Sequence, residues 1–491
     1  MKTFLNLRIN LGFSIKFYPL ILLLSLLLSC KKFIEIDAPI TSINDKNVYA
    51  TNSNATAVLT GIYTKMSNNP FSLNLSLYPD LLADNMTLFD QNNISAQQYY
   101  QNDLNSLYKN QLTNYWFDLY SYIYVVNAAI EGISASQGLS PAVKQRLLGE
   151  AYFLRAFYNF YLVNIYGNVP LLTSIDYSIN SIKGNNQVSK TYEQIILDLQ
   201  QAQSLLDDDY KDGSVINNST DRVRPNRMAA TALLARVYLY TNKFVQAEVE
   251  SSKIISKSDV YSLSDLNSVF LKNSSETIWS LQPVSTNVNT MEGNFYIYSS
   301  DGPNGINFVF LSDDILNSFE PGDLRKKYWI GTFDANNTIY SYPLKYKVKV
   351  GDPSESKEFT VVLRLAEQYL IRAEARIQQE HISGGIADLN ALRTRSRAEA
   401  TIQIPNPLPN LSVNLNKEQA LSAVQKERRV ELFTEWGDRW FDLKRTGNIN
   451  EIMSRITPLK GGTWSSYKSL LPIPQSEIKL NSNLIQNPGY N

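Results

Sequence analysis

The stretch that decides the fold is residues 224–255, RPNRMAATALLARVYLYTNKFVQAEVESSKII. Apolar residues recur three or four positions apart on both sides of Thr241-Asn242-Lys243, which predicts two helices joined by a short turn. Small residues at Ala235 and Ala247 would let the two helix backbones approach closely, and aromatic residues such as Tyr238 would fill the flanks. This arrangement is the pattern of a tetratricopeptide hairpin.

The same pattern returns at residues 365–397, LAEQYLIRAEARIQQEHISGGIADLNALRTRSR, where Ala375 and Ala387 repeat the spacing of Ala235 and Ala247. The apolar run 142–166 is long enough to form the first half of another such unit. Two hairpins with one spacing predict a mainly α protein. We expect a tetratricopeptide-like helical-repeat scaffold with long irregular loops and a few short β-strands.

Other segments fit around this scaffold. Helical periodicity predicts further helices at 52–66, 111–133, 191–206 and, as one continuous element, 421–447. Short strands are expected at 277–281 and 341–348, where apolar and aromatic residues cluster. The polar, aromatic and asparagine-rich segments 68–110 and 284–310 are expected to be long irregular loops, which in a compact protein are often functional.

The N-terminus has the form of an export signal. Lys2, Arg8 and Lys16 precede the apolar run LILLLSLLLSC, which ends at Cys30, the only cysteine of the chain. The break before a cysteine is similar to a bacterial lipobox and predicts a lipoprotein signal peptide over 1–29, with Cys30 as the lipidated residue. The alternatives are an uncleaved transmembrane anchor, for which the run is short, and an ordinary signal peptide with a chance cysteine.

Composition excludes several classes of site. Without residues 1–29 the chain has a net charge near −3, so it lacks the basic footprint of a nucleic-acid-binding protein. If Cys30 carries lipid, no thiol remains for a disulfide or a cysteine metal site. His381, the single histidine, excludes a multi-histidine metal site. We therefore expect no metal, no cofactor and no nucleic acid. The acidic run 207–213 could suggest a calcium site, but its carboxylates do not alternate with other residues as the ligands of an EF-hand loop do.

Charged residues recur every fourth position near the C-terminus, at Glu427, Glu431, Glu435 and Arg439. One interpretation is a carboxylate pair for glycoside hydrolysis, but such a pair must face each other across a sugar, and neighbours on one helix project the same way. The favoured interpretation is a buried ion-pair network in which Arg428, Arg429 and Arg439 offset glutamate repulsion. No catalytic residue is predicted.

The aromatic loops are the best candidates for a binding site. Sugars offer an apolar C–H face and a ring of hydroxyl groups, so a sugar site needs flat aromatic rings beside amide or carboxylate partners. The residues that could supply this chemistry are Asp84, Asn92, Tyr99, Tyr100, Asn102, Asn294, Tyr296 and Tyr298. Tyr296 and Tyr298 would share one side of an extended segment. The alternatives are that these tyrosines pack the loops onto the helices or contact a partner protein.

At the last predicted helix the chain resembles a known family. The run 427–445, ERRVELFTEWGDRWFDLKR, resembles the C-terminal signature of the SusD/RagB family. The tail pieces LPIP at 471–474 and QNPGY at 486–490, together with LRAF at 154–157, YGNVPL at 166–171 and AEA at 373–375, are similar to that family in the same order. The resemblance runs from Cys30 to the last residue and is weakest over 68–110 and 284–340.

The resemblance implies a surface-exposed outer-membrane lipoprotein, not an enzyme, that binds a nutrient and delivers it to a SusC-like TonB-dependent transporter. The ligand implied is an oligo- or polysaccharide. It also implies a SusD-like N-terminal helical region over 30–215 and a SusD/RagB C-terminal region over 216–491 that carries long ligand-binding loops. The alternatives are a peptide-binding RagB-like uptake protein, a surface glycoside hydrolase, and an adaptor that only caps the transporter.

Overall fold

The computed structural model describes residues 48–105, 115–285, 289–351 and 357–490. The expected signal peptide, the expected lipidation site Cys30 and the segment that follows it lie outside these ranges. Within them, no helix is both long and apolar enough to cross a bilayer. Residues 49–490 form one compact unit, and its architecture is mainly α, as predicted. The proposed division at residue 215 stays a prediction.

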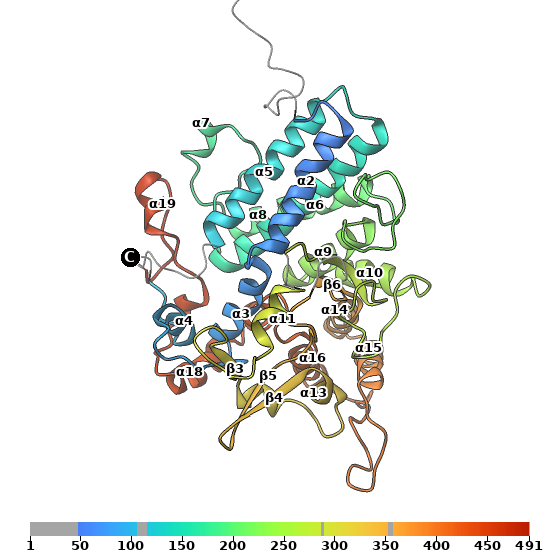
Figure 1. The fold of residues 1–491 in the computed structure, drawn as a ribbon, viewed down its shortest axis with the longest axis vertical. Helices are drawn as coiled ribbons and strands as arrows, with labels where there is room; N and C mark the ends of the chain where they lie inside the picture. The colour runs from blue at the N-terminus through green and yellow to red at the C-terminus, as the bar shows by residue number, and fades with distance from the viewer. Residues whose placement is uncertain (1–47, 106–114, 286–288, 352–356, 491) are drawn as a thin grey trace, which may run out of the picture. The chain divides into compact units, whose positions relative to one another are not determined.

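Helices make up most of this unit (Figure 1). They are α2 (Asn52–Asn68), α3 (Phe71–Leu82), α4 (Ile94–Tyr100), α5 (Tyr115–Ala135), α6 (Pro141–Tyr166), α7 (Tyr177–Asn180), α8 (Val188–Leu205), α9 (Arg227–Tyr240), α10 (Phe244–Ile255), α11 (Met291–Tyr296), α12 (Asp313–Leu316), α13 (Leu324–Tyr328), α14 (Leu365–Gln378), α15 (Ile382–Arg395), α16 (Lys417–Leu432), α17 (Asp438–Arg445), α18 (Ile449–Leu459) and α19 (Gln475–Leu480). A 3₁₀ turn, η3, spans Ser466–Ser469.

The strands are short and pair in three antiparallel ribbons. They are β1 (Met86–Leu88) with β3 (Val309–Leu311), β2 (Thr277–Leu281) with β6 (Thr360–Arg364), and β4 (Ile330–Ala335) with β5 (Thr338–Pro343). The strand predicted at 277–281 is confirmed. The one predicted at 341–348 is confirmed only to Pro343, where the ladder with β4 ends.

The helical frame is a series of neighbours packed side by side: α5 on α6, α6 on α8, α8 on α9, α9 on α10, α10 on α14 and α14 on α15. Both predicted hairpins are present, as α9–α10 and α14–α15. Proline at N1 suits the start of α6 at Pro141, and Gly167, with φ of 73°, ends it. The tetratricopeptide-like scaffold expected from the sequence is therefore the frame of the structure.

Close approach within the second hairpin depends on Gly385. A Cβ atom there would lie 2.7 Å from the carbonyl oxygen of Ala373 and 2.5 Å from the Ile377 side chain. We expect Gly385→Ala to lower the free energy of unfolding by about 1–3 kcal/mol, because the two helices would have to separate. Urea unfolding followed by circular dichroism measures this change.

Gly61 supplies the matched control, because it is also helical but a Cβ atom added there would meet nothing within 4 Å. We expect Gly61→Ala to raise the free energy of unfolding by about 0.5–1 kcal/mol, since alanine loses less backbone entropy on folding. Equal changes in the free energy of unfolding for the two substitutions would show that helix propensity, and not the approach of α14 to α15, determines the effect at Gly385.

The segment 68–110 is not the irregular loop that was expected. It contains α3, an almost entirely buried helix that accommodates Pro79 in its interior, and then β1 and α4. Prolines and asparagines indicated a loop, but burial of Leu73, Leu75 and Leu81 outweighs those local preferences. The segment 284–310 likewise contains α11 and β3.

The single helix predicted over 421–447 is also wrong. Helix α16 ends at Leu432 and α17 begins at Asp438, with left-handed backbone at Thr434, Trp436 and Gly437 between them. The break is held from α3: the Thr434 amide donates to Asp80 Oδ2 at 2.8 Å. The Trp436 amide donates to Ser76 Oγ at 3.1 Å. These bonds supply partners for backbone groups that a continuous helix would have satisfied internally.

Candidate ligand-binding site

The carboxylates of the C-terminal signature lie in a buried ion-pair network, as the sequence predicted. Glu431 accepts from Arg364 at 2.8 Å and from Arg395 at 2.5 Å through one oxygen, and from Arg325 at 2.8 Å through the other. Burial alone would raise the pKa of Glu431, but the three guanidinium groups hold it well below its usual value. A carboxylate so fully engaged has no free oxygen to serve as an acid or a nucleophile.

The basic partners differ from those expected. Arg428 pairs with Asp438 at 2.6 Å and with Asp442 at 3.0 Å rather than with glutamates of its own helix. The cations that do hold the glutamates come from α13, β6 and α15 and from Lys345, which follows β5. All of them are distant from α16 in the sequence. The network therefore ties α16 to the rest of the frame.

Asp84, a predicted ligand-binding residue, belongs to this charged framework. It is buried and receives Arg439 through two hydrogen bonds of 2.8 and 2.7 Å, with Arg429 3.1 Å away. Burial would raise the pKa of Asp84, but Arg429 and Arg439 lower it below its usual value. The side chain faces the two arginines and not a ligand-accessible surface.

Four more of the predicted residues are buried and attach the loops to the frame. The Tyr99 ring packs on Tyr78 with centroids 4.5 Å apart, and Asn102 donates to the Leu82 carbonyl. Tyr296 ends helix α11, so it does not alternate with Tyr298 along an extended segment. The Tyr298 hydroxyl donates to the Val309 carbonyl at 2.6 Å. In this structure these four side chains pack the loops onto the helices, which is one of the alternatives that the sequence left open.

The remaining three predicted residues keep some exposure. Asn92 is exposed beside Asp90, whose carboxylate accepts from the Asn92 amide at 3.0 Å. Tyr100 is half-buried, with the Lys460 ammonium group 5.0 Å from its ring centroid. Asn294 is half-buried, and its carbonyl accepts from Lys349. Ligand contact by these side chains stays a prediction.

Three partly exposed aromatic rings meet near the predicted residues, and we call Phe89, Phe310 and Tyr340 the aromatic cluster. Strand β1 pairs with β3 and β5 lies against β3, which brings together residues far apart in the chain. The Tyr340 ring lies 5.4 Å from that of Phe89 and 5.2 Å from that of Phe310, nearly perpendicular to both. Figure 1 places β3, β4 and β5 side by side at one end of the unit.

Polar groups border the aromatic cluster. Asp90 Oδ2 lies close to Gly305, and the loop carrying Gly305 is folded by Asn304, whose side-chain oxygen accepts from the Ile306 and Asn307 amides. Flat rings beside carboxylate and amide groups are the chemistry expected for sugar binding. This is the region that the sequence indicated, but different residues present the rings.

A signal for part of this site was present in the sequence. Asn336-Asn337 has left-handed backbone at both positions and joins β4 to β5, as in a two-residue hairpin turn. Aromatic and β-branched residues flank this pair, so the hairpin and Tyr340 could have been found. The meeting of Phe89 and Phe310 at the Tyr340 ring could not, since it depends on tertiary contact between β1 and β3.

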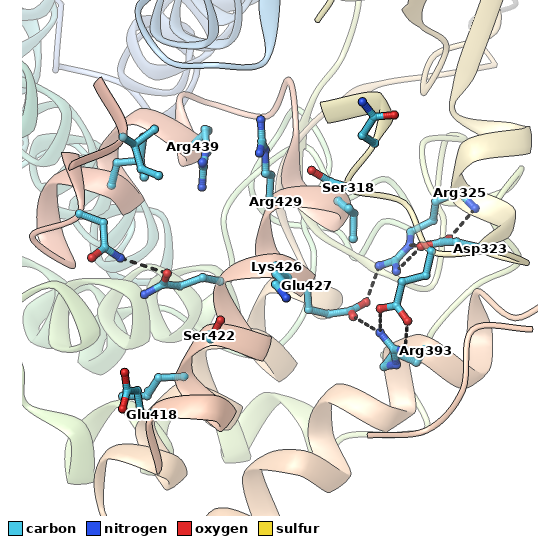
Figure 2. A pocket seen from close by; sticks show the side chains of 18 of the residues that line it. Ser318, Asp323, Arg325, Arg393, Glu418, Ser422, Lys426, Glu427, Arg429 and Arg439 are labelled. Carbon is cyan, nitrogen blue, oxygen red and sulfur yellow. Dashed lines mark hydrogen bonds and ion pairs between the residues drawn. The ribbon is translucent and has the colours of Figure 1, made fainter. Parts of the chain in front are cut away.

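A second feature is a charged groove of about 1110 Å³ along the outer face of α16 (Figure 2). Arg325 and Arg393 form one wall together with the carboxylates of Asp323, Glu320 and Glu427 that they bind. No aromatic ring is among the residues that line it. The groove suits a ligand with charges of both signs better than the apolar face of a neutral sugar.

Metal ligation has no candidate in the described part of the chain: no three His, Cys, Asp or Glu side chains there are grouped to hold an ion. In the acidic run 207–213, Asp207 pairs with Arg146 at 2.8 Å and Asp208 with Lys257 at 2.7 Å. The Asp212 carboxylate accepts from Ser214 within its own turn. These carboxylates are thus engaged by neighbouring protein groups.

Comparison with known proteins gives a consistent result. Residues 32–239 match the family model described as "Starch-binding associating with outer membrane", and residues 330–490 match the model described as "SusD family". The chain is 26% identical to SusD-like protein P2 of Formosa agariphila, over 96% of this chain and 98% of the relative.

Solved structures agree at the level of the fold. A SusD superfamily protein from Bacteroides vulgatus has a TM-score of 0.75 at 19% identity, covering 90% of this chain and 99% of that one. A laminarin binding SusD-like protein has a TM-score of 0.70 at 23% identity, covering 90% and 100%. With the frame, the C-terminal signature and two family models in agreement, the chain belongs to the SusD/RagB family.

Proposed function

We propose that the protein is a cell-surface lipoprotein that binds an oligosaccharide through the aromatic cluster and delivers it to a SusC-like TonB-dependent transporter. The observation that carries this proposal is the meeting of Phe89, Phe310 and Tyr340 at one partly exposed place beside Asp90. Aromatic rings bury apolar sugar faces, and neighbouring carboxylate and amide groups bind hydroxyls. The signal peptide and Cys30 would place the protein on the outer membrane.

Titration calorimetry against a panel of oligosaccharides, starting with laminarin fragments, tests the binding step. We expect Tyr340→Ala to weaken binding of the recognised sugar by roughly 5- to 150-fold, as expected for loss of about 1–3 kcal/mol of aromatic stacking. Tyr340 is chosen because both other rings pack against it.

The matched control is Phe117→Ala, which removes an exposed ring from α5. Its Kd should equal that of the unchanged protein. Equal weakening by both substitutions, or no binding of any oligosaccharide by the unchanged protein, would contradict the assignment of the aromatic cluster as the sugar site.

A peptide ligand is the second candidate, and the charged groove is the observation that favours it. Glu418, Lys426 and Glu451 line the groove and make no ion pair with the described residues, so both signs of charge are available. If a peptide is the ligand, a peptide panel should give heat of binding that Lys426→Gln reduces and Tyr340→Ala leaves unchanged. The opposite pattern would support the sugar.

Membrane attachment and partnership are tested separately. Metabolic labelling with a fatty-acid probe should modify the unchanged chain and not the Cys30→Ser variant. Affinity capture from outer-membrane extracts should recover a TonB-dependent transporter. Capture of the transporter with no effect of any sugar would favour the adaptor, and release of reducing sugar from a polysaccharide would favour the glycosidase.

A further inference from the structure

Two segments far apart in the sequence form one exposed apolar surface. We call it the α7–α19 surface and define it by Tyr177, Ile179, Ile182, Leu480 and Ile485. These side chains are between 54% and 82% exposed. In Figure 1, α7 and α19 lie along the same side of the unit, away from β4 and β5. Large apolar side chains gathered in this way indicate a contact with another apolar phase or molecule.

The surface is held in place by asparagine side chains. Asn481 donates to the Lys183 carbonyl at 2.9 Å, and Asn483 donates to the Ile182 carbonyl at 2.6 Å. Asn185 donates to the Ile485 carbonyl at 3.0 Å and accepts from the Ile485 amide at 3.2 Å. These bonds satisfy the backbone of two irregular segments while their apolar side chains point outward. The exposure is thus a property of a fixed structure and not of a loose loop.

The surface begins beside the point where the N-terminal segment joins the frame. Glu131 accepts from the Ile175 amide at 3.0 Å, two residues before Tyr177. The next residue, Gly132, packs against the Tyr49 ring, and Ser136 donates to the Tyr49 carbonyl. Tyr49 therefore lies close to the α7 end of the surface. Cys30, the expected lipid attachment point, is only 19 residues before it in the chain.

We propose that the α7–α19 surface rests on the lipid headgroup region of the membrane that carries the lipid anchor. This inference rests on the proposed lipidation, because a linker of 19 residues spans at most ~68 Å and confines the unit near the bilayer. Because the tether holds the unit near the bilayer, the local concentration of membrane around the α7–α19 surface is high. A contact with weak intrinsic affinity can then still form. A tyrosine with three isoleucines and a leucine is a composition that partitions into the interface.

Charge at the surface agrees with a membrane partner. Lys479 is exposed on α19, and Lys183 lies in the segment that Asn481 and Asn483 hold by hydrogen bonds. Cations are therefore available for anionic headgroups. The nearest carboxylate on α7 is Asp176, which accepts from the Ser178 amide and hydroxyl at 2.8 and 2.6 Å as a helix cap. Glu477 on α19 is half-buried.

The test uses a tether that does not depend on lipidation. The chain from residue 31 is given an N-terminal histidine tag and held on phosphatidylcholine–phosphatidylglycerol vesicles that contain nickel-chelating lipid. Because Cys30 is the only cysteine, Ile182→Cys provides a single site for an environment-sensitive fluorophore. Val245→Cys, at an equally exposed apolar position on α10, is the matched control. Both labelled chains are checked for unchanged thermal melting.

On vesicles, the label at 182 should brighten at least about twofold, shift to the blue and be quenched by lipid-borne quenchers, while the label at 245 should not change. Replacing Tyr177, Leu480 and Ile485 by serine should abolish the response at 182. A label at 182 that stays in water on tethered vesicles overturns the proposal, as does one that is shielded only when membrane proteins are added. Failure of fatty-acid labelling at Cys30 would instead count against the lipoprotein assignment.

Discussion

Glu431→Ala is expected to lower the free energy of unfolding by about 3–5 kcal/mol, which is the largest effect we expect from a single substitution. The side chain is fully buried and is the shared counter-ion of Arg325, Arg364 and Arg395. Its removal leaves three buried guanidinium groups with too few carboxylates, and unpaired buried charge is costly. Urea unfolding at neutral pH, followed by tryptophan fluorescence, measures the loss.

Glu418→Ala is the matched control, because Glu418 lies on the same helix but is exposed and belongs to no ion pair among the described residues. Its effect should stay within about 0.5 kcal/mol. A similar small effect at Glu431 would show that the network fixes the arrangement of the helices without stabilising it.

The effect at Glu431 should depend on pH. The pKa of the Glu431 carboxyl is held well below its ordinary value of 4.5 in the folded protein, because the guanidinium groups outweigh the effect of burial. The unfolded chain therefore binds this proton first as pH falls. The stabilisation is present above about pH 4.5 and is lost below it. The difference between the unchanged protein and Glu431→Ala should accordingly shrink as pH falls below 4.5.

Asp84→Asn is expected to cost about 3 kcal/mol of stability, because Arg429 and Arg439 would lose the carboxylate that they share at bonding distance. The Asp84 carbonyl also accepts from the Ser312 hydroxyl, so the residue joins the start of β1 to the end of β3. Urea unfolding reports the cost, and calorimetry with the recognised oligosaccharide reports whether binding changes.

The two measurements distinguish a structural from a ligand-binding role for Asp84. Because the side chain is only 2% exposed, we expect the Kd of the folded variant to change less than about twofold. Unchanged stability combined with lost binding would instead show that Asp84 contacts the ligand, as the sequence alone suggested.

Local sequence was sufficient for the frame. In the two hairpins, helical periodicity and small residues such as Ala235 and Ala375 act within a few turns, and the structure contains both helix pairs. The break at 433–437 could not be predicted in this way, because Glu431, Glu435 and Arg439 continue the helical spacing. It is set by side chains of α3, far away in the sequence.

The candidate site could also be predicted only in part from the sequence. The sequence indicated the two regions that meet there, since aromatic residues in polar surroundings are unusual for a core. It could not separate rings that hold a loop down, such as Tyr99 and Tyr296, from rings that face outward, such as Phe89 and Tyr340. That distinction depends on which strand pairs with which, and β1 pairs with β3 only in the folded chain.

The bonds from α3 to the break between α16 and α17 have a consequence for biosynthesis. They join residues 354 and 360 positions apart, so the buried carboxylate of Asp80 has no Thr434 amide to bind until nearly the whole polypeptide has left the ribosome. Contacts of such sequence separation slow folding and leave early helices with exposed apolar faces in the meantime. A nascent chain of this kind can complete its native state only once nearly all of its length is available to fold.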